Sequence, residues 1–201
     1  PGAGDYAAGN VFLPTSPNQR DFCVQTFERH CKNSGLELFG WRDVPVDPTV
    51  PGQIAAKTAP FVKQVFLGLK SPKEDPLDLE RKLFIARKKT EHEIRTSRLS
   101  QSGYFYIPSL SPRIIIFKGL LMPLDIRKYY LDLQDPRVVT RLALVHQRFS
   151  TNTFPTWDLA QPFRYMCHNG EINTLRGNIS RMISREELMA SDWFGQDLRE
   201  L

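Results

Sequence analysis

The order of secondary-structure patterns in the first seventy residues limits the possible fold more than any other feature of this sequence. Residues 5–13 read as a strand, residues 16–35 as a helix, and residues 36–46 and 61–69 as two further strands. Residues 52–59 add one or two helical turns between the last two strands. A strand–helix–strand–strand order is typical of helices packed on a sheet rather than of a helix bundle. The sequence therefore predicts an α+β fold.

Three longer helices are indicated by their ends and by their apolar spacing. In the first, Ser16 can cap the helix, Pro17 suits the first helical position, and Gly35 ends it. A second helix covers residues 76–97, and a third begins near Asn173. The expected inner side of the second helix consists of Leu79, Leu83, Phe84 and Ala86. The expected buried face of the third consists of Leu175, Ile179, Met182 and Ile183.

The remaining segments predict mostly strands. We expect residues 103–111 and 113–121 to form a hairpin, because a Ser/Pro turn separates two apolar runs. A short helix is expected within residues 123–133. Residues 141–149 alternate apolar and polar residues as a half-buried strand does, and residues 163–168 read as one more strand.

Composition excludes several classes of protein. Hydrophobic residues make up 41% of the 201 residues and charged residues 24%, so we expect one sizeable core and a single domain spanning residues 1–201. No apolar stretch of about 18 residues predicts a membrane span, and no signal peptide is visible. The net charge of +5 is too small to indicate nucleic-acid binding unless the charge clusters. The densest basic stretch, residues 81–95, favours a solvated helix face.

The cysteines indicate the compartment. Cys23, Cys31 and Cys167 form no disulfide-framework spacing. Cys23 and Cys31 lie eight residues apart on one expected helix, which separates them by roughly 12 Å, too far for a disulfide. A reducing compartment is therefore expected, namely the cytoplasm, or a plastid if the source is a plant or alga.

Polar residues that neither periodicity nor capping requires gather between positions 146 and 178. One expected strand ends in "HQRFSTNT" and the next in "HNGEINT", and neighbouring strand ends would bring these turns together. The first turn supplies the cation Arg148 and the hydroxyl of Thr151. The second supplies the side-chain amide of Asn169 and the unobstructed backbone N–H of Gly170.

These groups suit a small substrate with a carboxylate and a reacting carbonyl. An amide donor beside a glycine N–H can form an oxyanion hole, because two fixed donors stabilise charge on a carbonyl oxygen under attack. The guanidinium of Arg148 can bind a carboxylate through two parallel hydrogen bonds. The alternative is structural, since Asn169-Gly170 is first of all a hairpin-turn dipeptide.

The sequence gives weaker support for a cysteine nucleophile and for a metal site. Cys167 is adjacent to His168, but successive strand residues point to opposite faces, so the pair cannot act together and Cys167 is expected to be a small buried hydrophobic residue. His146 and His168 would form a metal pair only with a third ligand, which the spacing does not supply. We therefore expect no metal site in this segment.

The stretch "VHQRFSTNTFPTWDLAQPFRYMCHNGEINTLRGN", residues 145–178, resembles the class II glutamine amidotransferases, which are N-terminal-nucleophile hydrolases. His-x-Arg-Phe-Ser-Thr followed by His-Asn-Gly is specific for that class. The tail "EINTLRGN" is similar to the glutamate synthases among them. The upstream "GNVFLP" and "QSGYFYIPSLSPRIIIFKGLL" also resemble that family, so the likeness covers nearly the whole chain.

The resemblance implies an αββα four-layer sandwich, incomplete at both ends, and the hydrolysis of glutamine to glutamate. Ammonia would pass to a synthase domain of the same polypeptide and react there with 2-oxoglutarate. FMN and an iron–sulfur cluster are expected in the parent enzyme and none in this segment. By position, Arg148 would hold the substrate α-carboxylate and Thr151 would line the same pocket. Asn169 and Gly170 would form the oxyanion hole.

The sequence departs from the family at the nucleophile. The family uses an amino-terminal cysteine whose own α-amine serves as the base. Here residue 1 is Pro and Cys23 lies on an expected helix, so we expect an internal fragment that is inactive alone. The family's acidic residue for the substrate amine is expected beyond Leu201. A non-catalytic glutamine-binding or regulatory module is the alternative, and a nucleic-acid binder would rest only on residues 81–98.

Overall fold

The chain divides into two units, Pro1–Cys167 and His168–Leu201, which are described separately. The computed structural model describes residue 2 and residues 4–71, 75–150, 153–169 and 175–200. Both units contain regular secondary structure, and the only sheet among the described residues belongs to the first. Mixed helices and an antiparallel sheet confirm the predicted α+β class.

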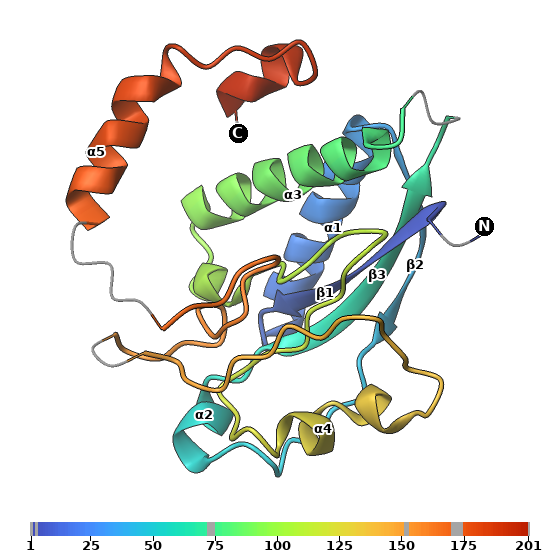
Figure 1. Cartoon of the computed structure of the whole chain (residues 1–201), viewed down its shortest axis with the longest axis vertical. Coiled ribbons are helices and arrows are strands. Elements are labelled where there is room, and N and C mark those ends of the chain that lie inside the picture. Colours follow the sequence, from blue (N-terminus) through green and yellow to red (C-terminus); the bar gives the residue numbers. More distant parts are fainter. Residues whose placement is uncertain (1, 3, 72–74, 151–152, 170–174, 201) are drawn as a thin grey trace. The chain divides into compact units, whose positions relative to one another are not determined.

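The frame of the first unit is an antiparallel sheet of three strands, β1 (Tyr6–Leu13), β2 (Leu36–Asp43) and β3 (Phe61–Leu69), in the order β1-β3-β2 (Figure 1). Tyr6 pairs with Gly68 and Leu13 with Phe61, so β1 and β3 run alongside each other over their whole length. A register shift between Leu38 and Gly40 interrupts the pairing of β2 with β3. All three predicted strands are therefore confirmed.

Two long helices, α1 (Pro17–Asn33) and α3 (Asp78–Thr96), lie side by side along one face of this sheet (Figure 1). Ser16 occupies the cap position of α1 without a side-chain capping hydrogen bond, and Gly35 follows the helix with φ of +76°. The core between helices and sheet includes Ala7, Val11, Leu13, Cys23, Phe27, Cys31, Val65, Leu67, Leu79, Leu83, Ala86 and Ile94. Burial of these apolar side chains is the main favourable term in folding.

The other face of the sheet is covered by irregular segments rather than by helices. A second apolar cluster packs there and consists of Phe12, Val44, Val62, Tyr106, Tyr129, Tyr130 and Trp157. It is bordered by the short helices α2 (Gln53–Lys57) and α4 (Ile126–Tyr129) and by a 3-10 turn, Leu131–Gln134. Both short helices lie within segments where the sequence predicted helical turns.

A row of polar side chains crosses this second face from strand to strand. The Asn10 amide donates to the Ile116 carbonyl oxygen over 3.0 Å, and the Gln64 amide donates to Asn10 Oδ1 over 3.1 Å. Arg42 Nε donates to Gln64 Oε1 over 2.7 Å, and the same guanidinium binds the Asp132 carboxylate. Asn10 and Gln64 are buried, so these partners remove the cost of desolvating two amides.

The predicted hairpin of residues 103–111 and 113–121 is wrong. Only isolated bridges join the first segment to β1, at Tyr106 and Ser111, and no strand forms in either. Side chains satisfy the backbone instead: the Ile116 N–H donates to Ser109 Oγ, and the Ile116 carbonyl accepts from Asn10. Prolines interrupt the ladder as well, because proline has no N–H to donate.

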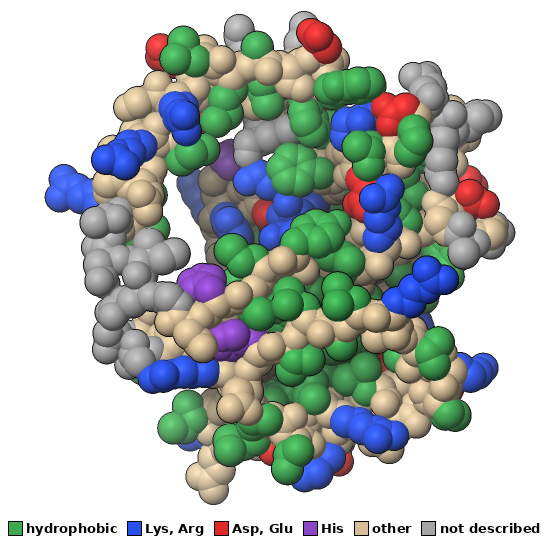
Figure 2. Space-filling model, viewed as in Figure 1, with side chains coloured by type: hydrophobic (Ala, Val, Ile, Leu, Met, Phe, Trp, Pro, Cys, Tyr) green, Lys and Arg blue, Asp and Glu red, His purple; other side chains and the backbone are tan. Residues whose placement is uncertain are grey.

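Two later strand predictions are also wrong. Residues 141–149 contain no strand, and in residues 163–168 a single bridge joins Phe163 to Met166 across a turn. An alternating pattern becomes a strand only beside a partner strand, and no described segment pairs with residues 141–149. Their apolar side chains are accordingly exposed, as at Leu142 and Val145. Figure 2 shows that hydrophobic side chains are widespread on the visible face.

Two burial predictions for helices are wrong as well. Phe84 on α3 is 39% exposed, whereas Leu79, Leu83 and Ala86 are buried as expected. The second unit contains α5 (Leu175–Glu186) and a 3-10 turn, Gly195–Glu200. The α5 side chains expected to be buried are exposed, namely Leu175, Ile179, Met182 and Ile183. Asn173, the expected start of this helix, lies outside the described residues.

Replacing Gly9 by alanine is expected to destabilise the fold by roughly 1–3 kcal/mol, because overpacking forces backbone shifts. A Cβ atom there would lie 2.4 Å from the Ser109 carbonyl oxygen and 3.1 Å from Leu110 Cα. Urea denaturation measures the change in free energy of unfolding. Gly103→Ala is the matched control, since no atom lies within 4 Å of its added Cβ. Equal effects of both variants would contradict the proposed close approach.

Candidate functional site

Arg148 is the candidate site residue whose surroundings are clearest. It lies in an extended segment of the first unit, and its side chain is exposed. Within the described part of the chain, no side chain accepts a hydrogen bond from its guanidinium. The nearby Ser150 hydroxyl accepts a 2.8 Å hydrogen bond from the Thr153 N–H. The guanidinium is therefore available to an anionic ligand.

The other candidate residues are placed less completely. Thr151 and Gly170 lie outside the described residues. Asn169 is exposed and belongs to the second unit, whereas Arg148 belongs to the first. The expected proximity of the segments that contain Arg148 and Asn169 stays a prediction. Cys167 is partly buried rather than fully buried, so its expected role as a core residue is only partly met.

The segment that follows Arg148 is anchored to the first unit by Trp157. The indole N–H donates to the Ala55 carbonyl oxygen over 3.0 Å. The ring packs edge-on against Phe12, with centroids 6.4 Å apart, and lies 5.5 Å from the Tyr129 ring. A Cβ atom on Gly119 would lie 2.4 Å from the indole, so only glycine allows this contact. The loop is thus fixed six residues after Thr151.

Lys118 is a buried cation beside this anchor that the sequence reading missed. Its side chain is 2% exposed, and its Nζ donates to the Asp158 carbonyl oxygen over 2.6 Å. Nζ also lies 4.5 Å from the centre of the Tyr106 ring and 4.8 Å from that of Phe163. Desolvation by burial lowers the Lys118 pKa to about 7. A lysine inside the apolar run "RIIIFKGLL" was the available signal.

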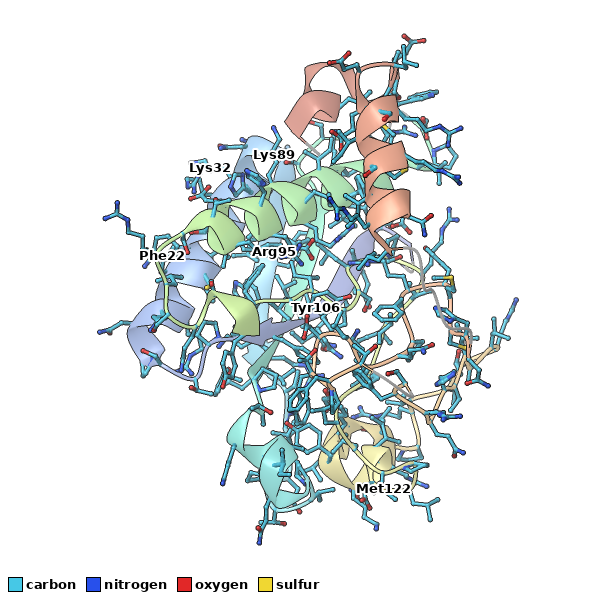
Figure 3. All side chains as sticks on the ribbon, turned by 90° about the vertical axis from the view of Figure 1, so that its left-hand side faces the viewer. Phe22, Lys32, Lys89, Arg95, Tyr106 and Met122 are labelled. Atoms are coloured by element: carbon cyan, nitrogen blue, oxygen red, sulfur yellow. The ribbon has the colours of Figure 1, made fainter. Side chains whose placement is uncertain are left out.

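Further charges surround Tyr106, which Figure 3 shows below α3. On α3, Arg87 Nη1 donates to Glu91 over 2.9 Å, and both side chains are buried. The Arg164 guanidinium donates to the Ile107 carbonyl oxygen over 3.2 Å. Burial lowers the pKa of Arg87, opposed chiefly by Glu91. The basic stretch 81–95 is therefore not wholly the solvated face that the sequence indicated.

Two of the three cysteines are unsuited to nucleophilic chemistry. Cys23 and Cys31 are buried in the core between α1, α3 and the sheet. Burial raises the pKa of the Cys23 thiol to about 12, and burial also raises the pKa of Cys31, to which the Glu28 carboxylate adds. A thiol is a strong nucleophile only as the thiolate, so both act as apolar core residues.

No group of three or more histidine, cysteine, aspartate or glutamate side chains able to hold a metal ion is found in residues 4–71, 75–150, 153–169 and 175–200. His146 belongs to the first unit and His168 to the second. In the same described ranges, no helix is long and apolar enough to cross a bilayer.

Residues 1–201, the whole sequence, match the profile of the family described as "Glutamine amidotransferases class-II". The chain belongs to this family. The family description names glutamine, which carries an α-carboxylate and an amide carbonyl.

Relatives of this amidotransferase chain are named as glutamate synthases. It is 45% identical over 196 residues, 98% of its length, to the glutamate synthase (NADPH) large chain of Bacillus subtilis. It is 40% identical over 206 residues, 100% of its length, to glutamate synthase (NADH) of Schizosaccharomyces pombe. It is 41% identical over 191 residues, 94% of its length, to the chloroplastic/mitochondrial ferredoxin-dependent glutamate synthase 1 of Arabidopsis thaliana.

The amidotransferase chain is much shorter than these relatives. It spans 13% of the Bacillus protein, 10% of the yeast protein and 12% of the plant protein. The likeness therefore concerns one region of each relative.

Proposed function

We propose that this segment belongs to the glutaminase domain of a glutamate synthase. The domain hydrolyses glutamine to glutamate and ammonia. In the synthase domain the ammonia would react with 2-oxoglutarate, two electrons and protons to give a second glutamate and water. The observation that carries this proposal is the identity of 40–45% to proteins named glutamate synthase over at least 94% of the chain. Residues 1–201 would form part of one such domain.

In this proposal Arg148 binds the α-carboxylate of glutamine, and Thr151 lines the same pocket. The exposed guanidinium of Arg148, with no described hydrogen-bond acceptor, supports its role. Asn169 and Gly170 donate to the amide carbonyl oxygen. As the nucleophile attacks, negative charge develops on that oxygen, and two fixed donors stabilise it more than they stabilise the neutral amide.

The attacking thiolate comes from the family's amino-terminal cysteine, with its own α-amine as base. The burial of Cys23 and Cys31 supports this assignment, because neither thiol ionises readily or meets a substrate. FMN and an iron–sulfur cluster would belong to the synthase domain of the same polypeptide, which receives the ammonia. The location in the plastid, if the source is a plant or alga, is supported by the chloroplastic/mitochondrial name of the Arabidopsis relative, and the cytoplasm is proposed for other sources.

We propose further that the sheet β1-β3-β2 and the helices α1 and α3 form one sheet–helix half of an αββα sandwich of the N-terminal-nucleophile hydrolase type. The packing of both helices on a single face of the antiparallel sheet supports this arrangement. The opposite face would then be directed toward the second sheet.

The full-length protein that carries this segment is expected to transfer the amide nitrogen of glutamine into newly formed glutamate. Glutamine labelled with ¹⁵N in the amide is supplied with 2-oxoglutarate and, in separate reactions, reduced ferredoxin, NADH or NADPH. Mass spectrometry then measures ¹⁵N in the α-amino group of glutamate. Glutamine binding in calorimetry without ammonia release would instead favour a non-catalytic glutamine-binding module.

A further inference from the structure

The buried ammonium group of Lys118 joins two segments that lie about forty residues apart in the sequence. Its Nζ donates to the Asp158 carbonyl oxygen over 2.6 Å, and the neighbouring Gly119 lies flat against the Trp157 indole. The Lys118 backbone is held from the other side, because the buried Tyr130 hydroxyl donates to its carbonyl oxygen over 2.7 Å. The later segment, which contains Trp157 and Asp158, is therefore attached to the fold at Lys118.

The attached segment is itself short and bounded by aromatic contacts. It begins at Trp157, which packs on Phe12 and Tyr129, and it ends at Phe163, whose ring lies 4.8 Å from Lys118 Nζ. At its start, the Ala160 N–H donates to the carbonyl oxygen of Thr156, the residue before Trp157, over 3.1 Å, which closes a turn. Removing the ammonium group would leave the Asp158 carbonyl without this donor and would free one side of the Phe163 ring.

We propose that Lys118 is a positioning residue for glutamine binding, because it holds residues 157–163 and so fixes the end of the segment that carries Arg148. This inference rests on the proposed function. Lys118 touches neither the substrate nor the reacting atoms. Its effect reaches glutamine through the loop, so it acts on the affinity for glutamine more than on the chemical step.

The protonation state of Lys118 affects how firmly residues 157–163 are held. A protonated amine makes a charge-assisted hydrogen bond and attracts the faces of Tyr106 and Phe163, whereas a neutral amine keeps only a weaker hydrogen bond. Desolvation brings the Lys118 pKa down to about 7, the Asp158 carboxylate opposes this shift, and the Arg164 guanidinium adds to it. Because desolvation outweighs these attractions, an opened loop with a solvated Lys118 would bind a proton more tightly than the closed loop does. The loop is therefore held less well below pH 7 and better as the pH rises above it.

The test uses the full-length protein with Lys118→Met, which keeps the length of the side chain and removes its donor and its charge. At pH 8 we expect KM for glutamine to rise about tenfold, as loss of the hydrogen bond that fixes the loop predicts, with kcat changed less than about twofold. In the wild type, KM should fall as the pH rises from 6 to 8.5, and in Lys118→Met it should be flat over that range. Lys57→Met, at an exposed lysine of α2, is the matched control.

Hydrogen exchange at one fixed pH gives a readout that does not depend on activity. Peptides covering residues 156–166 should exchange faster in Lys118→Met than in the wild type, and peptides from β3 should not. Unchanged exchange, or faster exchange with an unchanged KM and pH profile, would overturn the positioning role. A wild-type protein that releases no ammonia from glutamine would overturn the proposed function instead, while the exchange comparison would still report on the anchor.

Discussion

In the full-length protein, Asn169→Ala is expected to lower kcat for glutamine hydrolysis about 10²- to 10³-fold, with a much smaller change in KM. In its proposed role, the Asn169 amide donates to an oxygen that becomes strongly negative only in the transition state, and loss of one such donor raises the barrier by about 3 kcal/mol. Asn169→Asp should be at least as damaging, because a carboxylate would repel the developing negative charge. Ammonia release at saturating glutamine measures both variants.

Asn178→Ala is the matched control for this experiment. Asn178 lies on α5, is exposed, and has the same side chain at a position with no proposed role. It should keep wild-type kcat and KM. If Asn169→Ala hydrolysed glutamine as fast as this control does, Asn169 would be a turn residue only, and the oxyanion hole would have to be sought elsewhere.

Arg148→Met is expected to raise KM for glutamine about 100-fold while kcat falls much less. In the proposed role of Arg148, two charge-assisted hydrogen bonds to the α-carboxylate would together contribute about 3 kcal/mol, and each 1.4 kcal/mol is a factor of ten. Arg148→Lys should lie between the wild type and Arg148→Met, since an ammonium group keeps the charge and loses the paired geometry. Initial rates over a wide range of glutamine concentrations separate the two constants.

Arg141→Met serves as the control, because Arg141 is an exposed arginine of the same extended segment. A second comparison tests the assignment to the carboxylate itself. Glutamine methyl ester lacks the negative charge, so its KM should differ little between the wild type and Arg148→Met. An equal loss with glutamine and with its ester would contradict a carboxylate contact and would place Arg148 in a structural role.

The elements that were predicted correctly are those specified by local pattern. β1, β3 and α1 carry strong periodicity and turn residues at their ends, so each could be located without knowing its neighbours. The hairpin at residues 103–121 failed because its backbone groups bond to Ser109 and to the distant Asn10. Such long-range partners leave no mark on the local alternation of apolar and polar residues.

The residues discussed for the candidate site also differ in whether the sequence points to them. Arg148 and Asn169 were predicted because polar groups gather at two expected strand ends, and since neither strand forms, their shared site stays a prediction. Lys118 was overlooked, because the lysine in the apolar run was the one available signal and its partners at Asp158 and Phe163 follow forty or more residues later. A single lysine in an apolar run indicates burial only once the loop that covers it is known.

The polar row through Asn10, Gln64 and Arg42 specifies the register of the three strands. These residues face one another in the register Asn10–Gln64 and Gln64–Arg42, so each amide finds its partner only in this pairing. If β3 slid by two residues, its apolar side chains would still point to the same faces. The Gln64 amide, however, would be buried opposite side chains that cannot form hydrogen bonds with it. Hydrophobic packing alone would tolerate that slip, and the amides penalise it.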